Sequence, residues 1–136
     1  MRYASLIAFI ALLPTLALAD PNPNQLGLCY LFEKDVMKKA IPCVIGSGND
    51  DAGNFYSVLY NIAATPVRIE DNLGHAGPRR ITLNGAEAET YARDTSGHEV
   101  DRKTAYRASP DQRASFLSCF RTHNSTTSYC FTRQAM

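Results

Sequence analysis

The sequence predicts a small, mainly β single domain, an antiparallel meander or sandwich with minor helix and two disulfides. Apolar side chains alternate along short segments, as Leu28, Tyr30 and Phe32 do. Clusters of Gly, Asn, Asp, Ser and Pro separate these segments, as turns separate strands. Four cysteines follow an apolar N-terminal stretch, and an even number of cysteines in an exported chain predicts disulfides.

The N-terminus has the three parts of a secretory signal peptide. Arg2 precedes an uncharged run over residues 4–19, which Pro14 interrupts and Ala17-Leu18-Ala19 ends. Small side chains before the cleavage point suit signal peptidase, so we expect residues 1–19 to be removed. The run is shorter than the roughly 20 apolar residues of a spanning helix, and no later run reaches that length. We therefore expect no membrane span after signal removal and a periplasmic or secreted location.

The expected mature chain, residues 20–136, has no net charge. The whole sequence has 14 basic and 13 acidic residues, and the signal peptide takes away only Arg2, which leaves 13 of each. Nucleic acids and anionic membranes select basic clusters, so this balance argues against both as partners. The length suits one domain with a modest core, preceded by an extended, loosely held leader over residues 20–26 that contains two prolines.

Alternation assigns the strands in the first half. Residues 28–32 form the first, and 41–45 return as the second, which begins at Pro42 or lies on an edge because proline has no N–H. Residues 33–39 between them are charged and turn-like. The Gly- and Asx-rich stretch 46–54 is the predicted loop before the strongest strand, 55–62, and 67–70 is half-buried.

Turn and cap signals organise the second half. Asn84-Gly85 after residues 81–83 predicts a tight hairpin, so 86–94 is read as a return strand although its Ala and Glu also favour a helix. Residues 99–106 are read as a charged edge strand. Ser109-Pro110 with Gln112 predicts a capped helical turn. Strands over 116–121 and 128–133 then flank the loop 123–127.

The cysteines are expected to form two disulfides. Three pairings are possible, and we favour Cys29–Cys43 with Cys119–Cys130, because each of these pairs brackets a predicted hairpin. A zinc site is the competing interpretation. No cysteine pair has the two-residue spacing of zinc ligands, and no histidine pair supports them.

The sequence carries no motif that predicts a metal, a cofactor or catalysis. The oxygens of Asn49, Asp50, Asp51 and Asn54 are calcium-type ligands, but they lack the regular acidic spacing and the closing Glu of a calcium-binding loop, so a solvated turn is predicted. The histidines are scattered at 75, 98 and 123. Ser47 lacks the Gly-x-Ser-x-Gly frame of a nucleophile elbow, so we expect no enzyme.

These features favour an exported protein-binding domain, such as an inhibitor or a toxin-immunity-type protein, whose partner is another protein. Loops held by disulfides lower the ordering cost of binding. We expect contacts from the loops 46–54, 71–80 and 123–127, with side chains Asn49, Asp50, Asp51, Asn54, His75, Arg79, Arg80, His123 and Asn124. The alternative is a cell-wall, glycan, small-ligand or ion-binding module that uses the tyrosines and the Asx-rich loop, and after it a small hydrolase.

Overall fold

The computed structural model describes residues 20–75 and 77–133, so the predicted signal peptide lies outside the described part. The described chain forms nine strands and two short helices, in the order β1 (Asp20–Glu33), β2 (Val36–Asn49), β3 (Phe55–Tyr60), β4 (Val67–Asp71), β5 (Ile81–Leu83), β6 (Ala86–Arg93), β7 (Glu99–Val100), α1 (Arg102–Arg107), α2 (Pro110–Ser115), β8 (Leu117–Thr122) and β9 (Thr127–Arg133). The predicted fold class, mainly β and antiparallel with minor helix, is confirmed. Neither described helix has the length and apolar character needed to cross a membrane.

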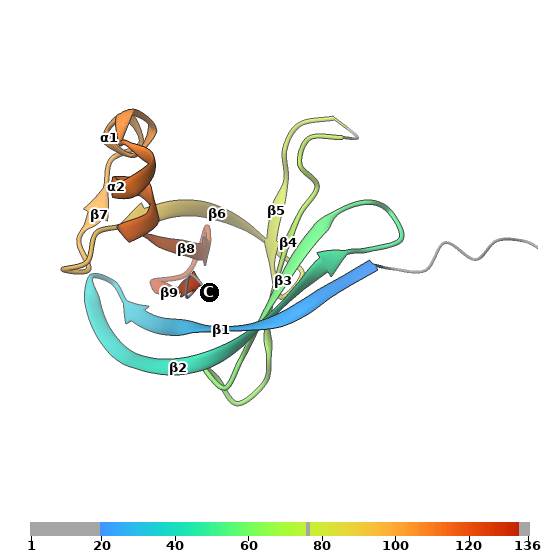
Figure 1. Cartoon of the computed structure of the whole chain (residues 1–136), viewed down its shortest axis with the longest axis horizontal. Helices are drawn as coiled ribbons and strands as arrows, with labels where there is room; N and C mark the ends of the chain where they lie inside the picture. Colours follow the sequence, from blue (N-terminus) through green and yellow to red (C-terminus); the bar gives the residue numbers. More distant parts are fainter. Residues whose placement is uncertain (1–19, 76, 134–136) are drawn as a thin grey trace, which may run out of the picture.

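The strands form one antiparallel sheet that closes on itself (Figure 1). β1 to β6 pair with their neighbours in chain order, as in a meander. β6 then pairs with β8, β8 with β9, and β9 returns to β1, so the last strand closes the ring. The short strand β7 pairs with β6 outside this ring, and the two helices connect β7 to β8.

Two apolar clusters lie on opposite faces of the β8–β9 ladder. Consecutive residues in a strand point to opposite faces, and Cys130 and Phe131 accordingly belong to different clusters. The larger cluster contains Cys29, Cys43, Ile45, Leu59, Ile62, Val67, Ile69, Ile81, Leu83, Ala88 and Phe131. The smaller one contains Phe32, Leu117, Cys119 and Cys130. Phe32 of the smaller cluster packs against Arg93, a residue of the candidate site.

Several sequence predictions are confirmed. Cys29–Cys43 and Cys119–Cys130 are bridged as favoured. Residues 86–93 form the return strand β6, and the preceding Asn84 and Gly85 have φ angles of 51° and 82°, as a tight hairpin turn requires. The predicted helical turn is α2, with the full capping box between Ser109 and Gln112.

The first hairpin is much longer than predicted. Residues 20–26 are extended but not loosely held, because Asp20 pairs with Asn49 and β1 runs on to Glu33 with two register shifts along the way. Residues 36–39, read as turn-like, belong to β2, and so do residues 46–49 of the predicted loop. Pairing of the backbone along a long partner strand overrides the weak β propensity of Lys, Pro and Gly.

The prediction of a strand over residues 99–106 is wrong after Val100. The Asp101 carboxylate accepts hydrogen bonds from the backbone N–H groups of Lys103 and Thr104, both at 3.0 Å, and so begins helix α1. An Asx residue at this position satisfies N–H groups that a helix start leaves free. The cap therefore decides the conformation, since no residue of α1 is buried.

Candidate functional site

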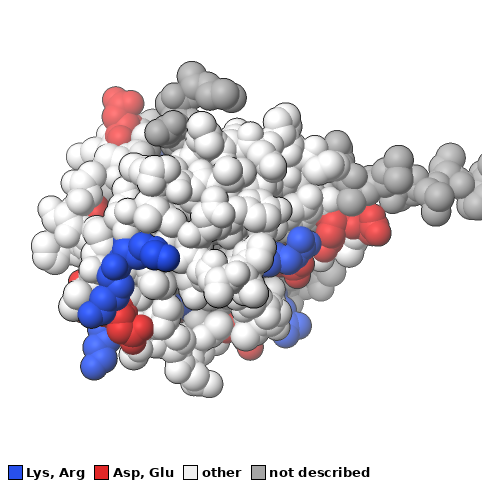
Figure 2. All heavy atoms as spheres, turned by 90° about the horizontal axis from the view of Figure 1, so that it is seen from below, with Lys and Arg blue, Asp and Glu red and all other residues white. Residues whose placement is uncertain are grey.

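The turn between β1 and β2 projects a basic and apolar segment from the sheet. We call residues 34–39 the β1–β2 tip. Its three lysines, Lys34, Lys38 and Lys39, are exposed, as are Val36 (57%) and Met37 (43%). Figure 2 shows basic side chains next to an acidic one at the end of the molecule where Figure 1 places this turn. Two exposed apolar side chains next to three lysines make this tip a candidate contact surface for a partner.

The turn itself holds a strained backbone. Glu33 pairs with Val36, so only Lys34 and Asp35 make the connection. Lys34 has a φ of 57°, in the left-handed region where a side chain crowds the following carbonyl. A non-glycine residue in this region costs about 1 kcal/mol or more and persists only when its surroundings fix it.

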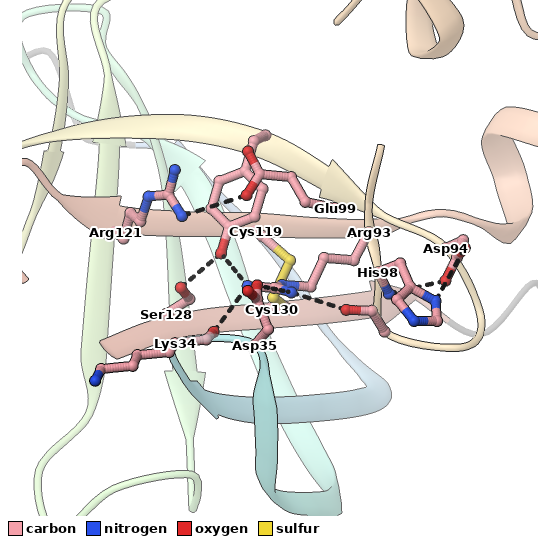
Figure 3. Close-up of polar contacts among 12 residues, drawn as sticks. Lys34, Asp35, Arg93, Asp94, His98, Glu99, Cys119, Arg121, Ser128 and Cys130 are labelled. Carbon is pink, nitrogen blue, oxygen red and sulfur yellow. Dashed lines mark hydrogen bonds and ion pairs between the residues drawn. A yellow bond between two sulfur atoms is a disulfide. The ribbon is translucent and has the colours of Figure 1, made fainter. Parts of the chain in front are cut away.

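Arg93, at the end of β6, fixes the turn from the interior of the molecule (Figure 3). Its side chain is fully buried, with 0% exposed. Its Nη2 donates to the carbonyl oxygen of Lys34 at 3.0 Å, and its Nη1 donates to the Asp35 carboxylate at 3.2 Å and to the carbonyl oxygen of Gly97 at 2.8 Å. One planar guanidinium therefore joins the tip to the loop between β6 and β7.

Aromatic rings hold this guanidinium in place. The Arg93 Cζ lies 4.3 Å from the centroid of the Phe32 ring and 5.3 Å from that of Tyr91. The Tyr91 hydroxyl accepts from Arg93 Nη2 at 3.1 Å and donates to the Ser128 hydroxyl at 2.5 Å. Arg121 covers Tyr91 at 4.4 Å, so two arginines and two aromatic rings form a continuous stack. Such cation–π contacts are favourable by about 0.5–2 kcal/mol each, more when they are desolvated.

The turn between β8 and β9 supports the tip from the side. The Lys34 N–H donates to the carbonyl oxygen of Thr126 at 2.8 Å. The Glu33 carboxylate accepts from the hydroxyls of Thr126 and of Thr127, the latter at 2.7 Å. These two hydroxyl donors hold the pKa of Glu33 below its ordinary value, because they favour the charged carboxylate. The segment therefore has hydrogen-bonded neighbours both beneath and beside it.

Both disulfides reinforce the same region. Cys29–Cys43 links β1 to β2, the two strands that carry the tip. Cys119–Cys130 belongs to the small cluster with Phe32, the ring on which the Arg93 guanidinium lies. A crosslink reduces the freedom of the unfolded chain, and within one hairpin it also prevents the strands from separating. The β1–β2 tip is consequently preorganised.

The structure distributes the three predicted contact loops over two regions. Asn54 and Arg80, from the first two loops, line the same shallow pocket. Their neighbours Asn49, Asp51 and His75 are exposed. The third loop, with exposed His123 and Asn124, ends at Thr126 and so lies next to the β1–β2 tip instead.

Two acidic side chains of the first two loops, Asp50 and Asp71, have internal partners. The Asp50 carboxylate accepts from the backbone N–H groups of Ala52 and Asn54 and from the Asn54 side chain, all at 2.9 Å, which closes the turn. These bonds, from the Asn54 side chain first, hold the pKa of Asp50 below its ordinary value. Asp71 binds Arg79, with Nη2 to Oδ2 at 2.5 Å. Over residues 20–75 and 77–133, no three His, Cys, Asp or Glu side chains form a group that could hold a metal ion.

Sequence reasoning missed the tip, which it treated as a charged connection. The sequence does contain a signal for it, because Val36-Met37 interrupts a run that is otherwise Lys and Asp. Two adjacent apolar residues among charges point to opposite faces of a strand, and at a hairpin end both faces are open to solvent. The fixing residue, Arg93, has no such signal, since it is 59 residues from Lys34 in sequence.

Comparisons with protein-family models, with curated proteins and with solved structures find no match.

Proposed function

We propose that this chain is an exported, non-catalytic protein-binding domain that presents the β1–β2 tip to a partner protein, as an inhibitor or a toxin-immunity-type protein does. One observation carries the proposal. A strained turn with exposed Val36 and Met37 is held by the fully buried Arg93 and flanked by two disulfides. Strained backbone that the surroundings hold in place clusters at binding sites.

The side chains of the tip define the chemistry of the partner. Met37 needs an apolar recess, to which its flexible, polarizable side chain adapts, and Val36 needs an apolar contact on the other face of the strand. Lys34, Lys38 and Lys39 need carboxylates around the recess, because rim charges of opposite sign steer association. The partner surface is therefore an apolar pocket with an acidic rim.

A rigid tip favours a protein partner. Each rotamer-rich side chain or loop that must become ordered on binding lowers the affinity, and a preorganised hairpin avoids much of this cost. The two disulfides are compatible with an oxidising, extracytoplasmic compartment, where such a domain meets secreted or delivered proteins.

The test begins with capture and ends with variants of the tip. The oxidised protein is immobilised, periplasmic and secreted extract of the source organism and its competitors is passed over it, and a retained stoichiometric protein is purified. Its affinity is then measured by titration calorimetry for the wild type and for the double variant Met37→Asp, Lys38→Glu. We expect the variant to bind about 30-fold more weakly, the loss typical of a central hot spot.

A charge reversal elsewhere provides the control. Lys103→Glu changes an exposed lysine on α1 and should leave the affinity unaltered, with the wild-type melting temperature in every variant. If the tip variant binds its partner as tightly as the wild type, or if the folded, bridged protein retains no partner, the proposal fails.

A further inference from the structure

A second concave site lies between the helices and the sheet. The groove has a volume of about 450 Å³ and runs along β6 and β8 beneath α1 and the end of α2. Its apolar surface comes from Val100, Ala105, Phe116 and Leu117. The volume is within the range of pockets that enclose small molecules, about 300–1,000 Å³.

Three carboxylates and two guanidinium groups line this groove, and they differ in whether they have partners. Its acidic residues have partners, because Glu89 and Glu99 bind Arg121 at 2.5 and 3.4 Å and Asp101 caps α1. Its two arginines, Arg102 and Arg113, form no ion pair or side-chain hydrogen bond with any residue in the described part of the chain. Two guanidinium groups therefore stand at an apolar groove with their charge available to a ligand.

A second, smaller pocket lies next to the groove. That cavity has a volume of about 190 Å³ and shares Thr90 and Ser118 with the groove. Its apolar wall comes from Phe55, Phe120 and Phe131, and the ion pair of Asp71 with Arg79 forms part of its polar wall. An apolar cavity of about 150 Å³ suffices to hold a benzene molecule, so this one has room for a ring or a short alkyl chain.

We infer that the groove binds a small amphipathic carboxylate. The planar forks of Arg102 and Arg113 match the two oxygens of a carboxylate, which they bind with charge-assisted hydrogen bonds. The hydrocarbon part lies on Leu117 and Phe116 and extends toward the cavity past Thr90. This site uses β6, β8 and the helices and does not depend on the partner proposed for the β1–β2 tip.

The probe is octanoate, with 1-octanol as the neutral molecule of equal chain length. Titration calorimetry on the oxidised wild type should show one octanoate per chain and an affinity about tenfold above that for octanol. The double variant Arg102→Gln, Arg113→Gln should lose about tenfold in octanoate affinity, as expected when two exposed ion pairs are removed, and keep its octanol affinity. Lys103→Gln, a neighbouring charge outside the groove, is the control.

A second measurement locates the ligand. In amide NMR spectra, octanoate should shift the signals of Thr90, Leu117 and Ser118 and leave those of the tip residues 34–39 in place. The inference is overturned if millimolar octanoate does not bind, if octanol binds equally well, or if the arginine variant keeps the wild-type octanoate affinity. Tip variants that lose the protein partner should bind octanoate normally, so the two proposals fail separately.

Discussion

Replacement of Arg93 by Met should destabilise the domain and loosen the β1–β2 tip together. Met has nearly the length of Arg and keeps contact with the Phe32 ring, but it has no donor. The carbonyl oxygens of Lys34 and Gly97 then lose their bonds from the guanidinium, at 3.0 and 2.8 Å. The strained turn also loses its support from beneath.

The magnitude follows from these contacts. Two carbonyl acceptors without their donors cost about 1 kcal/mol each, and the lost cation–π contact adds about 1 kcal/mol. The Asp35 side chain is 82% exposed, so its ion pair contributes little. The expected loss is about 3 kcal/mol of the free energy of unfolding. This is a large fraction of the roughly 5–15 kcal/mol by which small domains are stable.

Urea unfolding followed by circular dichroism measures this loss. With a slope of about 2 kcal/mol per molar urea, a loss of 3 kcal/mol lowers the midpoint by about 1.5 M at unchanged slope. The matched control is Arg121→Met, on the exposed side of the Tyr91 ring, which should cost less than about 1 kcal/mol. Equal losses in the free energy of unfolding for the two substitutions would refute the reasoning, since burial and the bonds to the turn would then add no stability.

Two further perturbations test how the sheet and its second loop are held. Replacing Cys29 and Cys43 together by Ala should lower the free energy of unfolding by about 2–5 kcal/mol; an unchanged melting temperature would show that this bridge is not structural. The hydrogen bond from Arg79 holds the pKa of Asp71 below its ordinary 3.8. The ionised Asp71 therefore stabilises the fold above pH 3.8, and this stabilisation is lost as the pH falls through the lowered pKa of the folded state. Between pH 5 and pH 2, the free energy of unfolding should therefore fall less for Asp71→Asn than for the wild type. Parallel curves of this free energy against pH would contradict the assignment.

Local patterns were sufficient for much of the fold. Asn84-Gly85 takes positive φ at little cost, and the Ser109–Gln112 capping box satisfies N–H groups at the start of α2, so both act over a few residues. The disulfide pairing was also predictable, because each pair closes one hairpin of adjacent strands. These features depend on neighbours in sequence, which a single sequence displays.

Features that depend on distant partners were not predictable. Residues 36–39 contain two lysines and a Met and join β2 only because a strand of equal length lies beside them. Arg93 stands in a stretch that alternates as an ordinary exposed strand would, and arginine is almost never fully buried without a partner. One partner, Gly97, lies in the turn that follows β6, but the other, Lys34, is 59 residues away in sequence and only the closed sheet brings it to Arg93. The candidate site is therefore a property of the closed topology.

The two proposed sites should differ in stiffness for a structural reason. The β1–β2 tip is held by the Arg93 guanidinium, by Thr126 and by strands that a disulfide links, so its conformation opens only when much of the sheet opens. The helices above the groove bury no residue and depend on their caps, which places them at the low end of local stability. A ligand in the groove can therefore order α1 and α2 as it binds, and its affinity includes that ordering cost. A partner at the tip meets a backbone that is already ordered, so its affinity does not include the cost of ordering that backbone.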